Sequence, residues 1–170
     1  SFDGSSTQQA EGGSSDCLLL PVQTYVGPLF ADSLVMCEVQ TGEHETHVSN
    51  MRAAAAKRVT DEWWFGFEQE YFFTDEKGEP LGWENGEPRP QGDYYCGVGA
   101  SNVEGREISE LHLEACLEAG IELTGTNAEV ALGQWEYQCL GKGIKAADDL
   151  WVSRYLLYKI AEDFGVGVNI

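Results

Sequence analysis

The residues best suited to chemistry are two glutamates, Glu68 and Glu70, inside an aromatic segment at 63–73. In an extended strand, side chains two positions apart share a face, which places their Cβ atoms roughly 6.5 to 7 Å apart. Two such charges repel by about 2 kcal/mol at an effective dielectric near 20, so a semi-enclosed pair needs a proton or a cation. Oxygen-only ligands suit Mg²⁺ or Mn²⁺. The pattern indicates a divalent-metal site, and two solvated glutamates on an outer face are the simpler alternative.

Two further glutamates, Glu129 and Glu136, also lie in apolar, strand-like sequence. They are seven positions apart, and seven is odd, so one straight strand would point them to opposite faces. A turn near Gly133 could bring both side chains to one site, but the spacing does not require it. The sequence therefore leaves open whether these carboxylates meet the first pair.

The strand predicted over 63–73 must present the first two glutamates on one face and bury the other. Parity puts Trp64, Gly66 and Phe72 beside the glutamates. The opposite positions are expected to be core, and they are Trp63, Phe65, Phe67, Gln69, Tyr71 and Phe73.

Other strands are predicted from apolar runs and the turn residues that bound them. Two short apolar segments, 17–22 and 34–39, follow a loop rich in Gly and Ser. Residues 121–140 resemble two strands with a turn near Gly133, and 166–170 begins another strand. The polar stretch that follows the early strands places a domain junction near residue 47.

Helices are predicted over 51–59, 108–119 and 146–164 from alanine content and apolar spacing. In the last of these, Asp148 and Asp149 fall in the first turn, where the helix dipole favours negative charge.

The charge balance excludes several classes of partner. Ten Lys and Arg against 29 Asp and Glu give a formal charge of −19, which opposes binding to nucleic acid or to an anionic membrane. No apolar run approaches the ~20 residues that a membrane helix needs. The five cysteines form no C-x-x-C pair and predict buried thiols in a reducing, cytoplasmic compartment. The first residues resemble the inside of a loop, so we expect a fragment of a longer protein.

Five blocks of sequence resemble glutamine synthetase, in its eukaryotic-type (type II) branch, and appear in family order along the whole chain. They are FDGSST at 2–7, WFGFEQEY at 64–71, YYCGVG at 94–99, NAEV at 127–130 and GQWEYQ at 133–138. The resemblance implies an α+β glutamine synthetase fold. Residues 1–47 would be the end of an amino-terminal β-grasp domain, and 48–170 the first part of the catalytic domain with its antiparallel sheet.

The same resemblance implies an ATP-dependent ligase that joins ammonia to glutamate through a γ-glutamyl phosphate, with Mg²⁺ or Mn²⁺ as cofactor. Glu70, Glu129 and Glu136 match ligands of the metal nearest glutamate, and Glu70 and Glu129 are also expected at the substrates. Glu68 matches a ligand of the metal that bridges the nucleotide phosphates, and Trp64 matches a residue near the nucleotide.

Asp3 matches the acid that helps to bind and deprotonate ammonium, with Ser6 and Tyr95 around the same pocket. In the family this loop serves the active site of the neighbouring subunit, which implies a homo-oligomeric ring. The family's metal-binding histidine, glutamate-binding arginines and flap glutamate are not in these 170 residues, so the chain alone is expected to be inactive. The alternative is a non-catalytic or truncated relative with a role in assembly. An unrelated acidic Mg²⁺ enzyme is a weaker third, because it would not explain the Asp3 loop.

Overall fold

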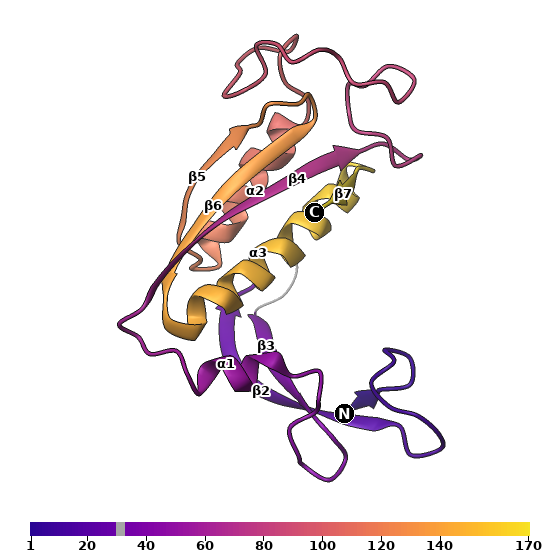
Figure 1. Ribbon diagram of the computed structural model, residues 1–170, viewed down its shortest axis with the longest axis vertical. Helices are drawn as coiled ribbons and strands as arrows, with labels where there is room; N and C mark the ends of the chain where they lie inside the picture. The colour runs from indigo at the N-terminus through magenta and orange to yellow at the C-terminus, as the bar shows by residue number, and fades with distance from the viewer. Residues whose placement is uncertain (30–32) are drawn as a thin grey trace.

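The computed structural model describes residues 1–29 and 33–170, which form two antiparallel sheets and three helices (Figure 1). A three-stranded sheet, in the order β1-β2-β3, occupies one end of the molecule. A four-stranded sheet, in the order β5-β6-β4-β7, makes up the other end together with α2 and α3. The elements are β1 Phe2–Asp3, β2 Asp16–Val26, β3 Ser33–Gln40, α1 Met51–Ala56, β4 Trp64–Thr74, α2 Arg106–Glu118, β5 Leu123–Ala128, β6 Gln134–Lys142, α3 Gly143–Asp163 and β7 Gly167–Asn169.

The small sheet carries the Asp3 loop at one end. Asp3 on β1 pairs with Asp16 at the start of β2, and β2 then runs antiparallel to β3. The register shifts between Pro21 and Gln23, where proline cannot donate a hydrogen bond to the ladder. Both predicted strands are confirmed, and each is longer than the apolar run that indicated it.

Both long helices cover the same face of the large sheet. Tyr137 on β6 shows this directly, because its ring lies 4.7 Å from that of His112 on α2 and its hydroxyl lies 2.8 Å from Oγ of Ser153 on α3. The core on this face consists of alternate strand residues and the inner sides of the helices, including Tyr71, Phe73, Trp135, Cys139, Ile108, Leu156, Leu157 and Ile160. The opposite face of the sheet carries the glutamates.

The expectation that Trp63 is a core residue is wrong, because its side chain is 57% exposed. Trp63 precedes β4, and the buried aromatics of that strand, Tyr71 and Phe73, lie at its other end. Phe65 and Phe67 are half-buried, and the three rings stack in a row with centroids 6.3 and 6.4 Å apart. This end of the strand therefore contributes an aromatic ladder rather than a filled core.

The predicted helices are all present, but their boundaries change one interpretation. α1 ends at Ala56, before the predicted end, and α3 begins at Gly143, before the predicted start. Asp148 and Asp149 therefore lie in the second turn of α3 and are 3% and 1% exposed. Their expected role at the helix dipole is wrong, since Asp148 binds Arg52, and Asp149 binds Tyr25 and also Lys145 of the same helix.

All five cysteines are free, and the expectation of buried thiols is confirmed for Cys17, Cys116 and Cys139. It is wrong for Cys37, which is half-buried, and for Cys96, which is exposed in a loop. Among the described residues, no helix has the length and apolar character needed to cross a membrane.

Candidate functional site

The glutamates of β4 and β6 share the face of the large sheet that the helices leave uncovered. Glu70 is the direct cross-strand partner of Glu136, and Glu68 is the partner of Gln138. Directly opposed residues of an antiparallel pair have Cα atoms about 4.5 to 5.5 Å apart. On the other side of β6, Asn127 of β5 pairs with the same Glu136. Two of the four carboxylates are thus neighbours by register alone.

The hairpin between β5 and β6 settles the question that the sequence left open. The Glu129 N–H donates to the Gln134 carbonyl at 2.9 Å, so the chain reverses direction between these two residues. Gly133 enables the turn: its φ is +83°, and a Cβ there would lie 2.6 Å from the Leu81 carbonyl oxygen. The reversal returns Glu129 to the face of Glu136, as the turn hypothesis required.

Both neighbouring carboxylates affect the pKa of Glu129. Burial raises its pKa, the Val130 N–H opposes this, and the charges of Glu136 and Glu70 raise the pKa further. Glu129 and Glu136 are 9% and 8% exposed, which is unusual for glutamates, and neither forms an ion pair with any of the described residues. Like charges gathered in a half-enclosed place favour either a proton or a cation between them.

Amide side chains hold these carboxylates, a role that the sequence alone did not predict. Gln134 donates to Glu70 at 2.7 Å, Gln138 donates to Glu136, and Asn127 donates to Glu129 at 3.2 Å. The signal was present, because Gln134 and Gln138 flank Glu136 at alternate positions of one strand.

As they stand, no three His, Cys, Asp or Glu side chains in the described ranges form a ready-made metal-binding group. The glutamates are turned toward the amides rather than toward one point. Their donor set still fits a hard divalent cation, because Glu70 on β4, Glu136 on β6 and Glu129 in the turn between β5 and β6 offer only oxygen ligands. Rotation about side-chain bonds is the change needed for all three to reach one ion.

Glu68 and Trp64 continue the same face of β4 away from this cluster. Glu68 borders a shallow hollow of about 360 Å³, also lined by Gly66, Thr124, Gln138 and Leu140. Trp64 is exposed, and the ammonium group of its cross-strand partner Lys142 lies 4.1 Å from the ring centroid. Lys142 is the one cation on β4 and β6, and no sequence pattern pointed to it.

The Asp3 loop lies in the small sheet, at the opposite end of the molecule from β5 (Figure 1). Asp3 accepts hydrogen bonds from the N–H and Oγ of Ser5 at 3.0 and 2.7 Å, and from Oγ of Ser6 at 3.0 Å. These bonds, that from the Ser5 hydroxyl above all, hold the pKa of Asp3 well below its usual range. The loop therefore presents an exposed carboxylate that stays ionised.

Tyr95 lies with the glutamates and not with Ser6. The Cys96 N–H donates to the Ala128 carbonyl at 2.9 Å, which fixes this loop beside Glu129. The charges of Cys96 and then Glu129 raise the pKa of the Tyr95 phenol. Within one chain Ser6 and Tyr95 are separated, so a pocket containing both would need two chains.

The fold and the site together define a class: a two-sheet α+β protein with an acidic centre on the uncovered face of its larger sheet. No known family model matches the chain. In fold it is similar to a crystal structure described as a novel glutamine synthase homolog, with a TM-score of 0.63 and 21% identity over 92% of this chain and 38% of that one.

Sequence comparison gives the family. The chain is 51% identical to glutamine synthetase 1, mitochondrial, of Drosophila melanogaster, over 99% of its own length and 44% of the relative's. It is 55% identical to a glutamine synthetase of Rhizobium meliloti, over 99% of this chain and 52% of the relative. The chain belongs to the glutamine synthetase family and spans about half the length of the curated relatives that it matches.

Proposed function

We propose that this chain carries the glutamate-side metal ligands of a glutamine synthetase, a ligase of nitrogen metabolism that makes glutamine from glutamate, ammonia and ATP. The observation that carries the proposal is the register of the large sheet, which pairs Glu70 with Glu136 and returns Glu129 to their face. The similarity to relatives named glutamine synthetase over 99% of the chain supports the same reaction.

In this proposal Glu70, Glu129 and Glu136 hold one Mg²⁺ or Mn²⁺, and Glu68 contributes to a second at the nucleotide phosphates. Bound divalent metals make an acidic face able to accept phosphates and stabilise charge on the transferring phosphoryl group. Trp64 lies four positions before Glu68 on the same face of β4 and offers a ring against which the nucleotide can pack.

Asp3 acts on ammonium in the second half of the reaction. The γ-carboxylate of glutamate takes the terminal phosphoryl group of ATP, and ammonia then displaces phosphate. Ammonium must lose a proton before it can attack, and an ionised Asp3 both attracts the cation and accepts that proton. Because the pKa of Asp3 is low, it is a weak base, so the step requires exclusion of water from the closed site.

The separation of Asp3 from Glu129 within one chain supports a ring of subunits in which each Asp3 loop completes a neighbour's site. Residues 1–47 would then be the part of a β-grasp domain that delivers Asp3, and 48–170 the start of the catalytic domain. We place the protein in the cytoplasm; relatives named as cytoplasmic and as mitochondrial are both known.

One substitution distinguishes the proposed synthetase from the alternative, a non-catalytic relative that assembles without turnover. In a synthetase of the relatives' full length that contains this sequence, Glu129→Ala should abolish glutamine formation and weaken Mn²⁺ binding. Glu118→Ala, at an exposed position of α2, is the matched control and should leave both unchanged. Glutamine formation that survives Glu129→Ala at saturating metal would refute the proposed function.

A further inference from the structure

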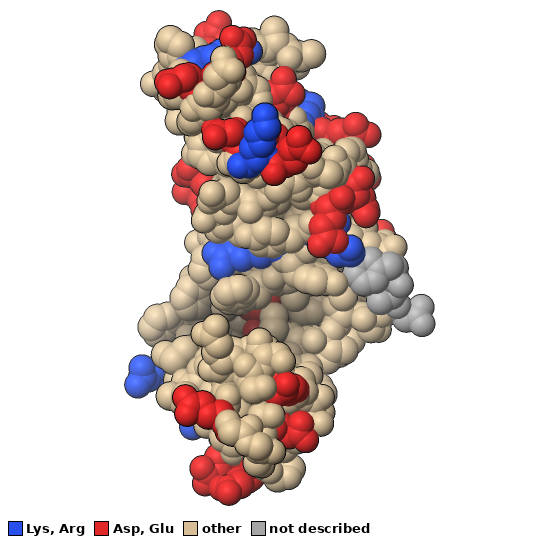
Figure 2. Space-filling view, turned by 90° about the vertical axis from the view of Figure 1, so that its right-hand side faces the viewer, with Lys and Arg blue, Asp and Glu red and all other residues tan. Residues whose placement is uncertain are grey.

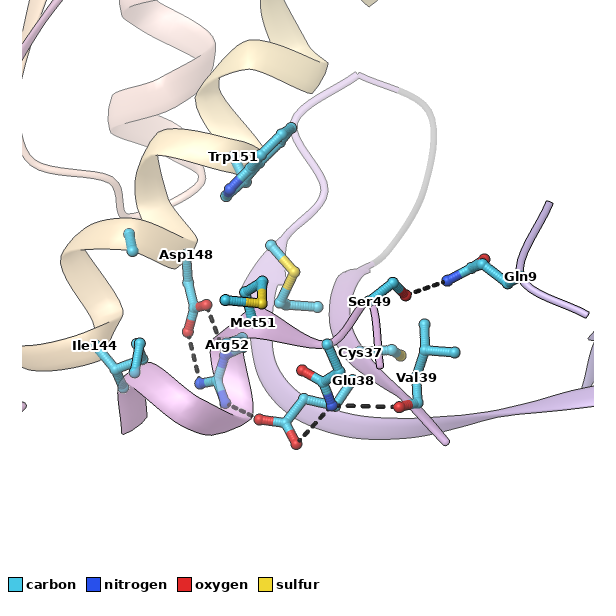
Figure 3. A pocket seen from close by; sticks show the side chains of 14 residues that line it. Gln9, Cys37, Glu38, Val39, Ser49, Met51, Arg52, Ile144, Asp148 and Trp151 are labelled. Carbon is cyan, nitrogen blue, oxygen red and sulfur yellow. Dashed lines mark hydrogen bonds and ion pairs between the residues drawn. The ribbon is translucent and has the colours of Figure 1, made fainter. Parts of the chain in front are cut away.

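Two adjacent aspartates of α3 reach across to two different elements of the amino-terminal part. Asp148 binds Arg52 of α1 through both carboxylate oxygens, each 2.8 Å from a guanidinium nitrogen. The third guanidinium nitrogen donates to Glu38 on β3 at 2.6 Å, so Arg52 joins β3 to α3 (Figure 3). Asp149 accepts a hydrogen bond from the Tyr25 hydroxyl of β2 at 2.7 Å. We call Arg52, Glu38, Tyr25, Asp148 and Asp149 the junction clamp.

Part of this junction is loosely filled, although Tyr25 belongs to the core and Leu34 and Met36 pack against that core. A cavity of about 510 Å³ lies between β3, α1 and the start of α3, with Met36, Met51 and Trp151 among its apolar walls. Figure 2 shows the molecule hollowed where its lower part, which contains the small sheet, meets the upper part. Apolar packing therefore does not lock the small sheet against α3 along its whole width. The polar contacts of the junction clamp supply directional bonds that such packing lacks.

The contacts of the junction clamp are better suited to orienting the small sheet than to stabilising the fold. Buried ion pairs add little net stability, because desolvation offsets their attraction, but they are demanding in geometry. The two-pronged contact between Arg52 and Asp148 fixes direction as well as distance. Burial and the bond to Asp149 raise the pKa of Tyr25, so its hydroxyl keeps its proton and remains a donor.

Asp3 lies beside the opposite end of β2 from the junction clamp, so a small rotation at the clamp produces a large displacement of Asp3. β2 runs from Asp16, the partner of Asp3, to Tyr25 near its other end, about 30 Å at 3.3 Å per residue. A rotation of about 5° at the Tyr25 end would displace Asp3 by about 2.6 Å over a strand of this rise. Misplacement of a reacting group by about 1 Å can cost ~10²-fold in rate.

We propose that the junction clamp is a set of positioning residues that aims the Asp3 loop, and so controls the use of ammonium at the neighbouring site. This inference rests on the proposed function. Its residues touch neither substrate nor metal, and they act only through the orientation of the small sheet. The clamp should therefore affect ammonium and spare glutamate, ATP and metal.

The kinetic test uses the assembled full-length synthetase with Tyr25→Phe, which removes one hydroxyl, and Arg52→Lys, which keeps the charge but loses the two-pronged contact. We expect the KM for ammonium to rise about tenfold with each, as misplacement predicts, and the KM for ATP and glutamate to stay within about twofold. Hydroxylamine, a nucleophile that is uncharged at neutral pH, should restore turnover. Equal losses with both nucleophiles would overturn the inference.

Tyr137→Phe is the matched control, because it also removes one buried phenolic hydroxyl with a partner at 2.8 Å, but inside the large-sheet core. It should not change the KM for ammonium. A structural readout is independent of the reaction: spin labels on unnatural amino acids at Ser14 and Glu118 report the distance from the Asp3 end of the small sheet to α2. We expect both clamp variants to broaden this distance distribution and Tyr137→Phe to leave it unchanged. An unchanged distance distribution in the clamp variants would overturn the inference, whether or not the enzyme makes glutamine. A failure to make glutamine would by itself contradict only the proposed function.

Discussion

Glu70 and Glu136 face one another as direct cross-strand partners in the centre of the large sheet. A protein that gained nothing from this contact would be expected to avoid it, because like charges directly opposite in a sheet are destabilising. Gln134 donates a hydrogen bond to Glu70 and Gln138 donates one to Glu136. These uncharged amides reduce the repulsion but do not neutralise it. The pair is therefore best explained by a ligand that carries positive charge.

The pair predicts opposite effects of one substitution with and without metal. Glu136→Gln should stabilise the metal-free chain by about 0.5 to 1 kcal/mol, because it removes the repulsion from Glu70. That difference corresponds to a rise of about 1 to 4 °C in the midpoint of thermal unfolding. Saturating Mg²⁺ should raise the midpoint of the unsubstituted chain more than that of the variant. An equal response to Mg²⁺ in the two chains would contradict a role for Glu136 as a ligand.

His112 predicts a stability that falls in mild acid. Burial lowers its pKa to about 4, whereas an unperturbed histidine titrates near 6.5. As the pH falls through 6.5 the unfolded chain binds a proton that the folded chain does not accept until about pH 4. The free energy of unfolding should therefore fall across this window by up to about 3 kcal/mol, by linkage.

Urea unfolding between pH 7 and pH 4 measures this loss. His112→Gln should remove most of the slope that the histidine contributes, although it lowers stability at every pH. His44→Gln, at an exposed position, is the control and should leave the slope as it is. A slope that persists in His112→Gln would assign the acid sensitivity to other groups.

Asp3 and Glu129 predict separable defects in the full-length enzyme. Asp3→Ala should mainly impair the use of ammonium, because Asp3 is not a proposed metal ligand and its carboxylate is held by Ser5 and Ser6 in the exposed loop. Glu129→Ala should abolish turnover with any nucleophile. Steady-state kinetics with ammonium and with hydroxylamine distinguish the two, and unchanged turnover of both variants at saturating ammonium and Mg²⁺ would refute both assignments.

The 170-residue chain by itself is predicted to be inactive and to self-associate. The chain spans about half the length of the relatives that it matches, and Glu68 is the one nucleotide-side metal ligand proposed within it. The outer edges of β5 and β7 have no strand beyond them in the described sheet, and such edges pair with other chains. Phosphate release assays and size-exclusion chromatography test both parts. Ammonium-dependent phosphate release from a monodisperse preparation would contradict both.

Much of the fold could be predicted because local patterns agreed with it. The alternation along β4 gave the two faces of Glu70 and Tyr71, and apolar spacing gave both long helices. The position of Glu129 could not be derived from spacing, since it depends on the hairpin at Gly133, which only the pairing of β5 with β6 defines.

The burial of the aspartates of α3 could not be predicted for a related reason. Helix boundaries are poorly encoded locally, and a start three residues earlier moved Asp148 and Asp149 from a solvated first turn to a buried second turn. Their partners in the amino-terminal part, Arg52 and Tyr25, are 96 and 124 residues away in sequence, and no short pattern could connect them.

The central claim is that Glu70, Glu129 and Glu136 bind one divalent metal, and anomalous X-ray scattering from Mn²⁺ in crystals of the full-length enzyme tests it most directly. We predict an anomalous peak on the uncovered face of the large sheet, with an oxygen of each of the three carboxylates about 2.0 to 2.6 Å from it. The amide partners Asn127, Gln134 and Gln138 should have released at least one carboxylate oxygen each. A manganese ion bound elsewhere, with the three glutamates still turned to their amides, would contradict the account.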